Sequence, residues 1–172
     1  SRGLGDVYNR QVLNFCWQSP EICRYTNDYI IDSVKKYKTR FIGFGMILLD
    51  NPKFSIPEID RCAKAGLRGI GEIRPSPETL TELELIKPVI YELIERDMVL
   101  LIHSSEPVGH QYPGKGFLTP DIIYKFILAF PELKIICAHW GGGLPFYALM
   151  PEVADTLSRV HYDTAATQYL YR

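Results

Sequence analysis

The sequence predicts an α/β protein whose parallel strands form an incomplete TIM-like (β/α)8 barrel of about six strand–helix units. Short β-rich runs alternate with one-sided helical stretches, a pattern that places parallel strands inside and helices outside. Successive strands begin about 30 residues apart, the length of one unit. An open doubly wound sheet usually carries a glycine-rich phosphate turn after its first strand, and this chain has none. We therefore treat residues 1–172 as a single partial-barrel domain.

Six strands are predicted, each from a short apolar run: 12–16, 41–49, 66–73, 98–103, 133–139 and 160–164. Helix starts are predicted from capping chemistry. Ser55 with Glu58 three residues later forms a capping box, and Ser76 and Thr119 each precede a first-turn proline. Between positions 78 and 97, apolar residues recur at three- and four-residue spacing, which predicts one helix with an apolar face on the sheet.

Composition and charge narrow the class of partner. With 47% hydrophobic residues the chain can bury one sizeable core. Nineteen Lys plus Arg against twenty Asp plus Glu leave a net charge of -1, which supplies no footprint for nucleic acid or anionic lipid. No apolar run approaches the ~20 residues of a membrane helix. We expect a small-molecule substrate, with neither nucleic acid nor a membrane as partner.

The cysteines and the chain start bear on the cellular setting. Cys16, Cys23, Cys62 and Cys137 contain no C-x-x-C pair, so we interpret them as reduced thiols and expect a cytoplasmic protein. The chain starts without an initiator Met or a signal peptide. We interpret this start as a cut rather than a natural beginning.

Polar residues terminate four consecutive predicted strands: Glu72, His103, His139 and Asp163. In a parallel barrel the reactive groups sit at the C-terminal strand ends, and neighbouring strands lie ~4.8 Å apart. These side chains can therefore share one metal ion or bracket one substrate. Each has an ordinary alternative, since a lone histidine after a strand is commonly structural and Asp163 could cap a turn. Four in register favour a shared site.

Two irregular segments lie beside these strand ends. Loop 106–116 holds three glycines and two prolines, and we expect it to wall the substrate pocket with His110 and Lys115; a solvated connector is the alternative. The glycine run after His139 offers backbone N–H groups for a substrate carboxylate, with Trp140 as a substrate-binding candidate. Close packing of strand and helix explains that run equally well. His161 is interpreted as a core histidine.

Five stretches together resemble a known family: 40–44, 65–70, 101–103, 138–142 and 162–165. They are similar to the amidohydrolase-type metal-dependent hydrolases, which include aminocarboxymuconate-semialdehyde decarboxylase and related nonoxidative decarboxylases. The resemblance implies a His-x-His pair ending the first strand, histidines ending the fifth and sixth, and an aspartate ending the eighth. His103 then matches the fifth-strand metal ligand. His139 matches the sixth-strand histidine, a ligand or a general acid/base.

The chain departs from this pattern at two places. It contains no His-x-His, and no strand follows Asp163 to bring the eighth-strand aspartate. By the resemblance the visible strands are the second to the seventh, so Asp163 lies on the seventh and does not replace that aspartate. We expect one wedge of the barrel with about three ligands to be missing. The fragment should then bind metal weakly, turn nothing over and associate, for instance as a homo-oligomer, through its open strand edges.

For an intact parent protein the resemblance implies a divalent metal, with zinc as the first candidate, that activates a water molecule. The candidate metal ligands are Glu72, His103 and His139, and a salt bridge from Glu72 to Arg68 or Arg74 is the alternative for that carboxylate. The candidate catalytic residues are His139 and Asp163.

The expected activity is that of a metal-dependent, amidohydrolase-type hydrolase acting on a small anionic substrate, slightly ahead of loss of carbon dioxide on the same scaffold. A metal-dependent deoxyribonuclease is an alternative, because such enzymes also carry Gly-Glu-Ile and Ile-His-Ser strand ends, here 71–73 and 102–104. The lack of a basic stripe makes it the weaker one. A non-catalytic fragment is a third interpretation.

Overall fold

The computed structural model describes residues 10–171 and confirms the incomplete barrel. Six parallel strands pair in chain order. The strands are β1 (Arg10–Val12), β2 (Phe41–Gly45), β3 (Gly69–Ile73), β4 (Val99–Ile102), β5 (Ile135–Cys137) and β6 (His161–Tyr162). Within the described chain, β1 pairs only with β2 and β6 only with β5. Association through these edges stays a prediction.

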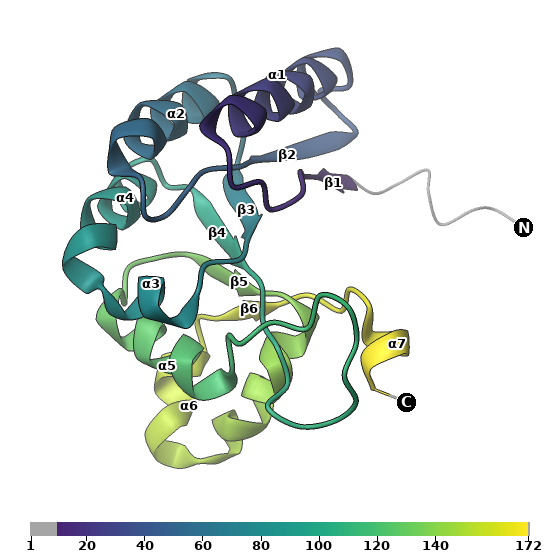
Figure 1. Cartoon of the computed structure of the whole chain (residues 1–172), viewed down its shortest axis with the longest axis vertical. Helices are drawn as coiled ribbons and strands as arrows, with labels where there is room; N and C mark the ends of the chain where they lie inside the picture. The colour runs from purple at the N-terminus through teal and green to yellow at the C-terminus, as the bar shows by residue number, and fades with distance from the viewer. Residues whose placement is uncertain (1–9, 172) are drawn as a thin grey trace, which may run out of the picture.

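Helices connect the strands and lie on the outer side of the curved sheet (Figure 1). They are α1 (Pro20–Lys36), α2 (Pro52–Lys64), α3 (Pro77–Thr81), α4 (Leu83–Glu95), α5 (Pro120–Ala129), the 3-10 segment η1 (His139–Leu149), α6 (Pro151–Leu157) and α7 (Thr167–Leu170). The loop between β4 and α5 extends toward α7 (Figure 1). No helix among the described residues has the length and apolar character to cross a membrane.

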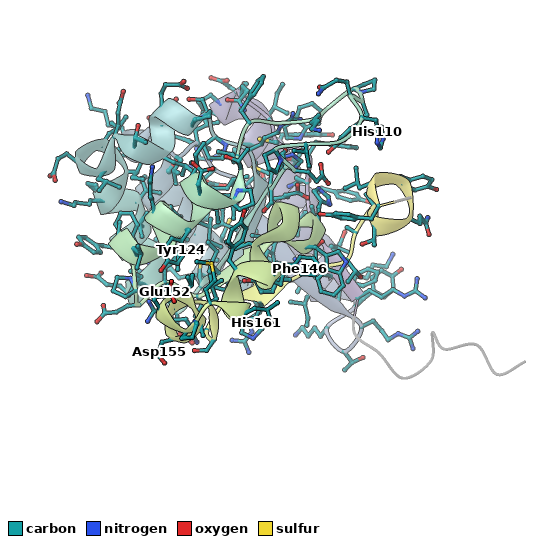
Figure 2. The ribbon with its side chains drawn as sticks, turned by 90° about the horizontal axis from the view of Figure 1, so that it is seen from below. His110, Tyr124, Phe146, Glu152, Asp155 and His161 are labelled. Atoms are coloured by element: carbon teal, nitrogen blue, oxygen red, sulfur yellow. The ribbon has the colours of Figure 1, made fainter. Side chains whose placement is uncertain are left out.

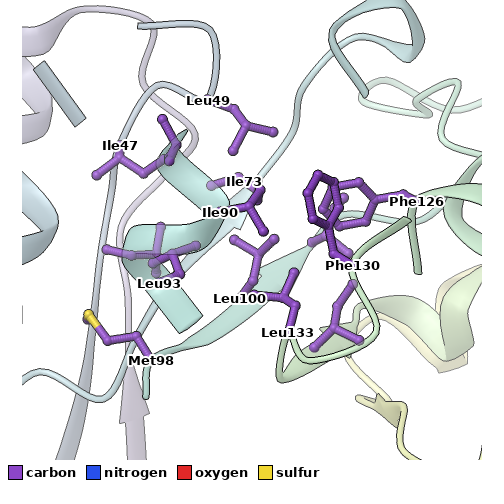
Figure 3. Close-up of a cluster of buried hydrophobic side chains, with 14 of the residues drawn as sticks. Ile47, Leu49, Ile73, Ile90, Leu93, Met98, Leu100, Phe126, Phe130 and Leu133 are labelled. Atoms are coloured by element: carbon purple, nitrogen blue, oxygen red, sulfur yellow. The ribbon is translucent and has the colours of Figure 1, made fainter. Parts of the chain in front are cut away.

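Alternation along the strands gives the sheet two apolar faces. Leu100 and Ile102 are fully buried in the main core. Side chains of α4 and α5, such as Ile90 and Phe126, lie near Leu100 in this core (Figure 3). Leu101 points to the opposite face and packs in a second, smaller cluster with Phe44 and Ala138. His103 follows Leu101 by two residues, so its side chain continues this second face at the strand end.

A close backbone contact precedes the site residue Glu72. Gly71 has φ +139°, and a Cβ there would collide with the backbone carbonyl of Leu101. Glycine therefore allows β3 to approach β4 closely one residue before Glu72.

The predicted capping box at Ser55 is wrong by one turn. The N-cap of α2 is Asn51, whose side chain accepts from the amide of Phe54, and Pro52 occupies the first turn. Ser55 lies inside the helix, where its hydroxyl donates to the carbonyl of Leu48 at 2.6 Å. The helix begins at Asn51 because this residue has a capping side chain and is followed by a proline, which is favoured in the first turn.

Every predicted strand is longer than the one observed, and two elements differ from prediction in more than length. The first strand is Arg10–Val12 rather than 12–16, because the chain leaves the β2 ladder after Val12 and lines a pocket instead. The single helix expected over 78–97 is broken at Glu82, whose ψ of 63° is not helical. The break lets α3 contact α5 as well as α4. The caps at Ser76 and Thr119 are confirmed as N-cap positions.

A buried polar network ties α1, α2 and the end of β2 together. Glu58 and Asn27 are both fully buried. Asn27 donates to Glu58 Oε1 at 2.8 Å and to the carbonyl of Met46 at 2.9 Å. Arg61 donates to both oxygens of Glu58, at 2.5 and 3.0 Å, and Arg24 adds a contact at 3.4 Å. Burial alone would raise the pKa of Glu58, but the hydrogen bonds from Arg61 and Asn27 lower it.

Candidate metal centre

The ends of β3, β4 and β5 bring Glu72, His103 and His139 to one point. His103 Nδ1 lies 2.7 Å from Glu72 Oε1, and His139 Nε2 lies 3.4 Å from the same oxygen. The two imidazole rings are edge-on, with centroids 5.0 Å apart. One ligand atom from each residue lies within 4.8 Å of the other two. The alternative salt bridges from Glu72 to Arg68 or Arg74 are not among the ion pairs of the described chain.

This cluster suits a divalent cation. Two atoms bound at about 2.1 Å to a tetrahedral ion lie roughly 3.4 Å apart. His139 Nε2 lies at this separation from Glu72 Oε1, at 3.4 Å, and His103 Nδ1 lies closer, at 2.7 Å. Two imidazoles and one carboxylate are ligands that zinc and manganese both accept. His103 is only 8% exposed, so little water competes on that side. The cluster opens on its other side into a cavity of about 700 Å³.

Glu72 and His139 are charged in the metal-free state. Burial would raise the pKa of Glu72, but hydrogen bonds from His103 and His139 outweigh it and bring that pKa to about 2. The hydrogen bond to Glu72 raises the pKa of His139 to about 9, against partial burial that lowers it. At neutral pH His139 is therefore an imidazolium paired with a carboxylate, which holds the place a cation would take.

The glycine run after His139 forms a left-handed turn. His139 and Trp140 have φ of 55° and 56°, and the three glycines continue with positive φ. Non-glycine residues rarely adopt this conformation. Gly142 is required for a second reason, because a Cβ there would collide with the carbonyl of Ser105. Close packing is therefore one reason for this run, but Gly142 packs against the loop after β4 and not, as expected, between a strand and a helix.

The amides at the start of this turn already have acceptors, so they do not form the open anion site that the sequence suggested. His139 N–H donates to Asp163 Oδ1 at 3.0 Å, and Trp140 N–H donates to the Asp163 carbonyl at 2.9 Å. The carboxylate held by this turn is the protein's own. Asp163 is not part of the Glu72–His103–His139 cluster.

The other predicted residues lie apart from the cluster. Lys115 Nζ donates to the carbonyls of Val108 and His110 and so braces its own loop. His110 is exposed on that loop (Figure 2). Trp140 lines a separate apolar cavity of about 540 Å³. Substrate binding by these three residues stays a prediction. The interpretation of His161 as a core histidine is wrong, because its side chain is exposed (Figure 2).

Sequence reasoning missed three residues of the site. Phe15 and Trp17 line the cavity beside the cluster. Ser105 bonds His103 Nε2 at 3.2 Å and accepts from the amide of Gly116 at 2.9 Å, which fixes the loop to the site. The signal was available for the aromatic pair, because both residues lie at or just after the C-terminal end of the first strand, predicted at 12–16.

A partial parallel barrel with a two-histidine, one-carboxylate cluster at its C-terminal strand ends is the architecture of a metal-dependent barrel enzyme. The model of the amidohydrolase family matches residues 7–171. The chain therefore belongs to the amidohydrolase family.

Curated relatives are similar over most of this chain. A gamma-resorcylate decarboxylase from Polaromonas sp. is 26% identical over 151 residues, which cover 73% of this chain and 46% of the relative. The 2-amino-3-carboxymuconate-6-semialdehyde decarboxylase of Dictyostelium discoideum is 29% identical over 150 residues, covering 76% and 42%. The chain thus spans about half the length of these relatives.

Solved structures agree on the fold. The 5-carboxyvanillate decarboxylase from Sphingomonas paucimobilis matches with a TM-score of 0.66 at 21% identity, over 87% of this chain and 58% of that one. The corresponding enzyme from Novosphingobium aromaticivorans matches with a TM-score of 0.61 at 25% identity, over 81% and 44%. That structure contains manganese and 4-hydroxy-3-methoxy-5-nitrobenzoic acid.

Proposed function

We propose that the protein is a metal-dependent decarboxylase that removes carbon dioxide from a small aromatic carboxylate. The observation that carries this proposal is the convergence of Glu72, His103 and His139 beside an open cavity. The relatives described above are decarboxylases by name, which favours loss of carbon dioxide over the hydrolysis that we expected from the sequence. Manganese in a related structure makes it a candidate alongside zinc.

Loss of carbon dioxide leaves the electron pair of the broken C–C bond on the ring carbon, which must then take a proton. In our proposal Glu72 and His103 hold the metal, and His139 delivers this proton from Nε2. His139 Nδ1 lies 2.9 Å from the carbonyl of Ala165, so Nε2 is the nitrogen that faces the cluster. A bound divalent ion would supply positive charge that holds and polarises the oxygens of the substrate.

The cavity has walls suited to an aromatic anion. Phe15 and Trp17 offer ring faces, and Arg74 offers a guanidinium that is exposed and has no carboxylate partner among the described residues. Arginine pairs with carboxylates in a planar, two-pronged geometry. We propose that Arg74 anchors the acidic group of the substrate, while His110 and Lys115 contribute only if their loop moves inward.

The cellular setting is part of the proposal. All four cysteines are free thiols and three are buried, which suits a reducing cytoplasm. Burial raises the pKa of Cys62 and of Cys137 to about 12, so these thiols stay protonated and unreactive.

The test measures carbon dioxide released from hydroxybenzoates by the intact parent protein loaded with manganese or with zinc, since we expect no turnover from the fragment alone. In D2O the product should carry deuterium at the carbon that lost the carboxyl group. His139→Gln should reduce turnover by about 100-fold or more, the usual range for a lost acid/base group. His161→Gln, at an exposed histidine outside the cluster and its cavity, is the matched control and should change turnover less than about twofold. Release of an acid and an amine from amide substrates, without carbon dioxide, would establish hydrolysis instead.

A further inference from the structure

We propose that Asp163 is a positioning residue that holds His139 in its working geometry without touching the substrate. This inference rests on the proposed function, in which His139 delivers a proton.

The backbone of His139 is in a strained conformation. Its φ of 55° lies in the left-handed region, where a side chain with a Cβ is strained. Such a conformation persists only where surrounding contacts hold it. Asp163 supplies the contact on the amide side, because its Oδ1 accepts from His139 N–H at 3.0 Å. Tyr171 supplies the contact on the other side, where its hydroxyl donates to the His139 carbonyl at 3.2 Å.

Asp163 also orients the imidazole ring of His139, through Ala165. Asp163 Oδ1 also accepts from the amide of Ala165 at 2.9 Å. The carbonyl of that same residue lies 2.9 Å from His139 Nδ1. One carboxylate oxygen therefore fixes both the strained backbone and the acceptor that orients the ring. Because this acceptor requires a proton on Nδ1, it directs Nε2 toward Glu72.

Asp163 lies outside the cavity beside the Glu72–His103–His139 cluster. Neither Asp163 nor Ala165 is among the residues that line the cavity at the cluster. The backbone of Asp163 is used as well, since its N–H donates to Cys137 and its carbonyl accepts from Trp140. Asp163 thus joins the ends of β5 and β6, and its influence on chemistry passes through His139.

The experiment compares Asp163→Ala with Asp163→Asn. Asparagine keeps an oxygen that can accept both amides, whereas alanine removes it. The direct readout, in metal-free protein, is the NMR signal of the His139 Nδ1 proton and its protection from solvent exchange. We expect protection in the wild type and in Asp163→Asn, and its loss in Asp163→Ala. With substrate, kcat should fall about 10-fold to 100-fold in Asp163→Ala, with KM and metal content within about twofold.

Two further variants test whether the effect is specific to the contacts of Asp163 with His139. Asp60→Ala removes a carboxylate that pairs with Lys64 and Arg96 on the outer helices, so it should leave the Nδ1 proton protected. If Asp163→Ala does not fold, Tyr171→Phe removes one hydroxyl and should reduce the protection in the same direction. An unchanged Nδ1 signal in Asp163→Ala overturns the inference. So does an Asp163→Asn variant as inactive as Asp163→Ala, since the charge itself would then be needed. An intact parent protein that shows the protected proton but releases no carbon dioxide would refute the proposed function alone.

Discussion

Two carboxylates in this chain are held by basic partners, yet they differ in what surrounds them. Glu58 is fully buried between helices, and both its oxygens are taken by Arg61 with help from Asn27. Glu72 stands at a strand end, partnered by two imidazoles and open to a cavity of about 700 Å³. An arginine partner keeps its proton at all ordinary pH values, whereas an imidazole can release one to admit a metal. A structural ion pair and a binding site therefore differ in the type of basic partner and in whether a cavity gives a ligand access to the carboxylate.

The largest effect on stability should come from breaking the closed network. Glu58→Ala leaves Arg61 and Asn27 without their acceptor, and breaking a buried charge pair costs about 3–5 kcal/mol. Urea denaturation of the metal-free protein measures this loss. Metal affinity of the folded fraction should not change. Glu84→Ala removes an exposed carboxylate paired with Lys87 and serves as control, with a loss below about 1 kcal/mol. Equal losses of unfolding free energy in Glu58→Ala and Glu84→Ala would show that the buried network of Glu58 stabilises the fold no more than an exposed ion pair.

Opening the second cluster should change metal affinity instead. Glu72→Gln keeps the shape of the side chain and removes its charge, so the affinity for manganese should fall by about 100-fold. Isothermal titration calorimetry measures this change. The cost in unfolding free energy should be smaller than for Glu58→Ala, since Glu72 reaches water. Unchanged manganese affinity in Glu72→Gln would place the metal elsewhere.

The pH dependence of stability should distinguish the two clusters on the alkaline side. The folded-state pKa of His139 is raised from 6.5 to about 9, so its pairing stabilises the metal-free protein fully below pH 6.5 and is lost as pH rises through 9. The pKa of Glu72 is lowered from 4.5 to about 2, so its contribution is complete above pH 4.5 and is lost as pH falls through 2. Their joint contribution is greatest between pH 4.5 and 6.5.

The Glu58 network, with its lowered carboxyl pKa and its arginine partners, loses stability only on the acid side. Thermal unfolding of the wild type and of Glu72→Gln between pH 5 and 10 measures the difference. The gap between the two proteins should shrink as pH rises through 9. A constant gap over this range would show that His139 does not pair with Glu72.

The smallest effect should come from Arg24, at the edge of the closed network. Its side chain is 60% exposed and contacts Glu58 at 3.4 Å. Arg24→Gln should cost less than about 1 kcal/mol, because exposed ion pairs are weak. Urea denaturation with a loss of 3 kcal/mol or more would show that Arg61 alone does not satisfy Glu58.

The fold and the position of the site could be predicted because both depend on local pattern. The end of each apolar run marks the end of a strand, so the sequence alone could place Glu72, His103 and His139 on one rim of the barrel. Glu58 could not be understood in this way. Its spacing from Ser55 matched a capping box, and only the packing of α1 against α2 assigns it to Asn27 and Arg61.

Asp163 shows the same limit at the site itself. Its position at a strand end predicted a side chain directed at the substrate, as for its three predecessors. The left-handed turn after β5 instead presents the amide of His139 to that carboxylate. Such a turn depends on the contact between Gly142 and Ser105, which are far apart in the sequence and adjacent only in the folded chain.

The most direct test is to locate the metal. Crystals of the protein with manganese, measured at the manganese absorption edge, give an anomalous signal at the ion alone. We predict one peak within about 2.0–2.3 Å of Glu72 and His103, with His139 directed at the same point. A manganese peak bound away from all three side chains would contradict the assignment of this cluster as the metal centre.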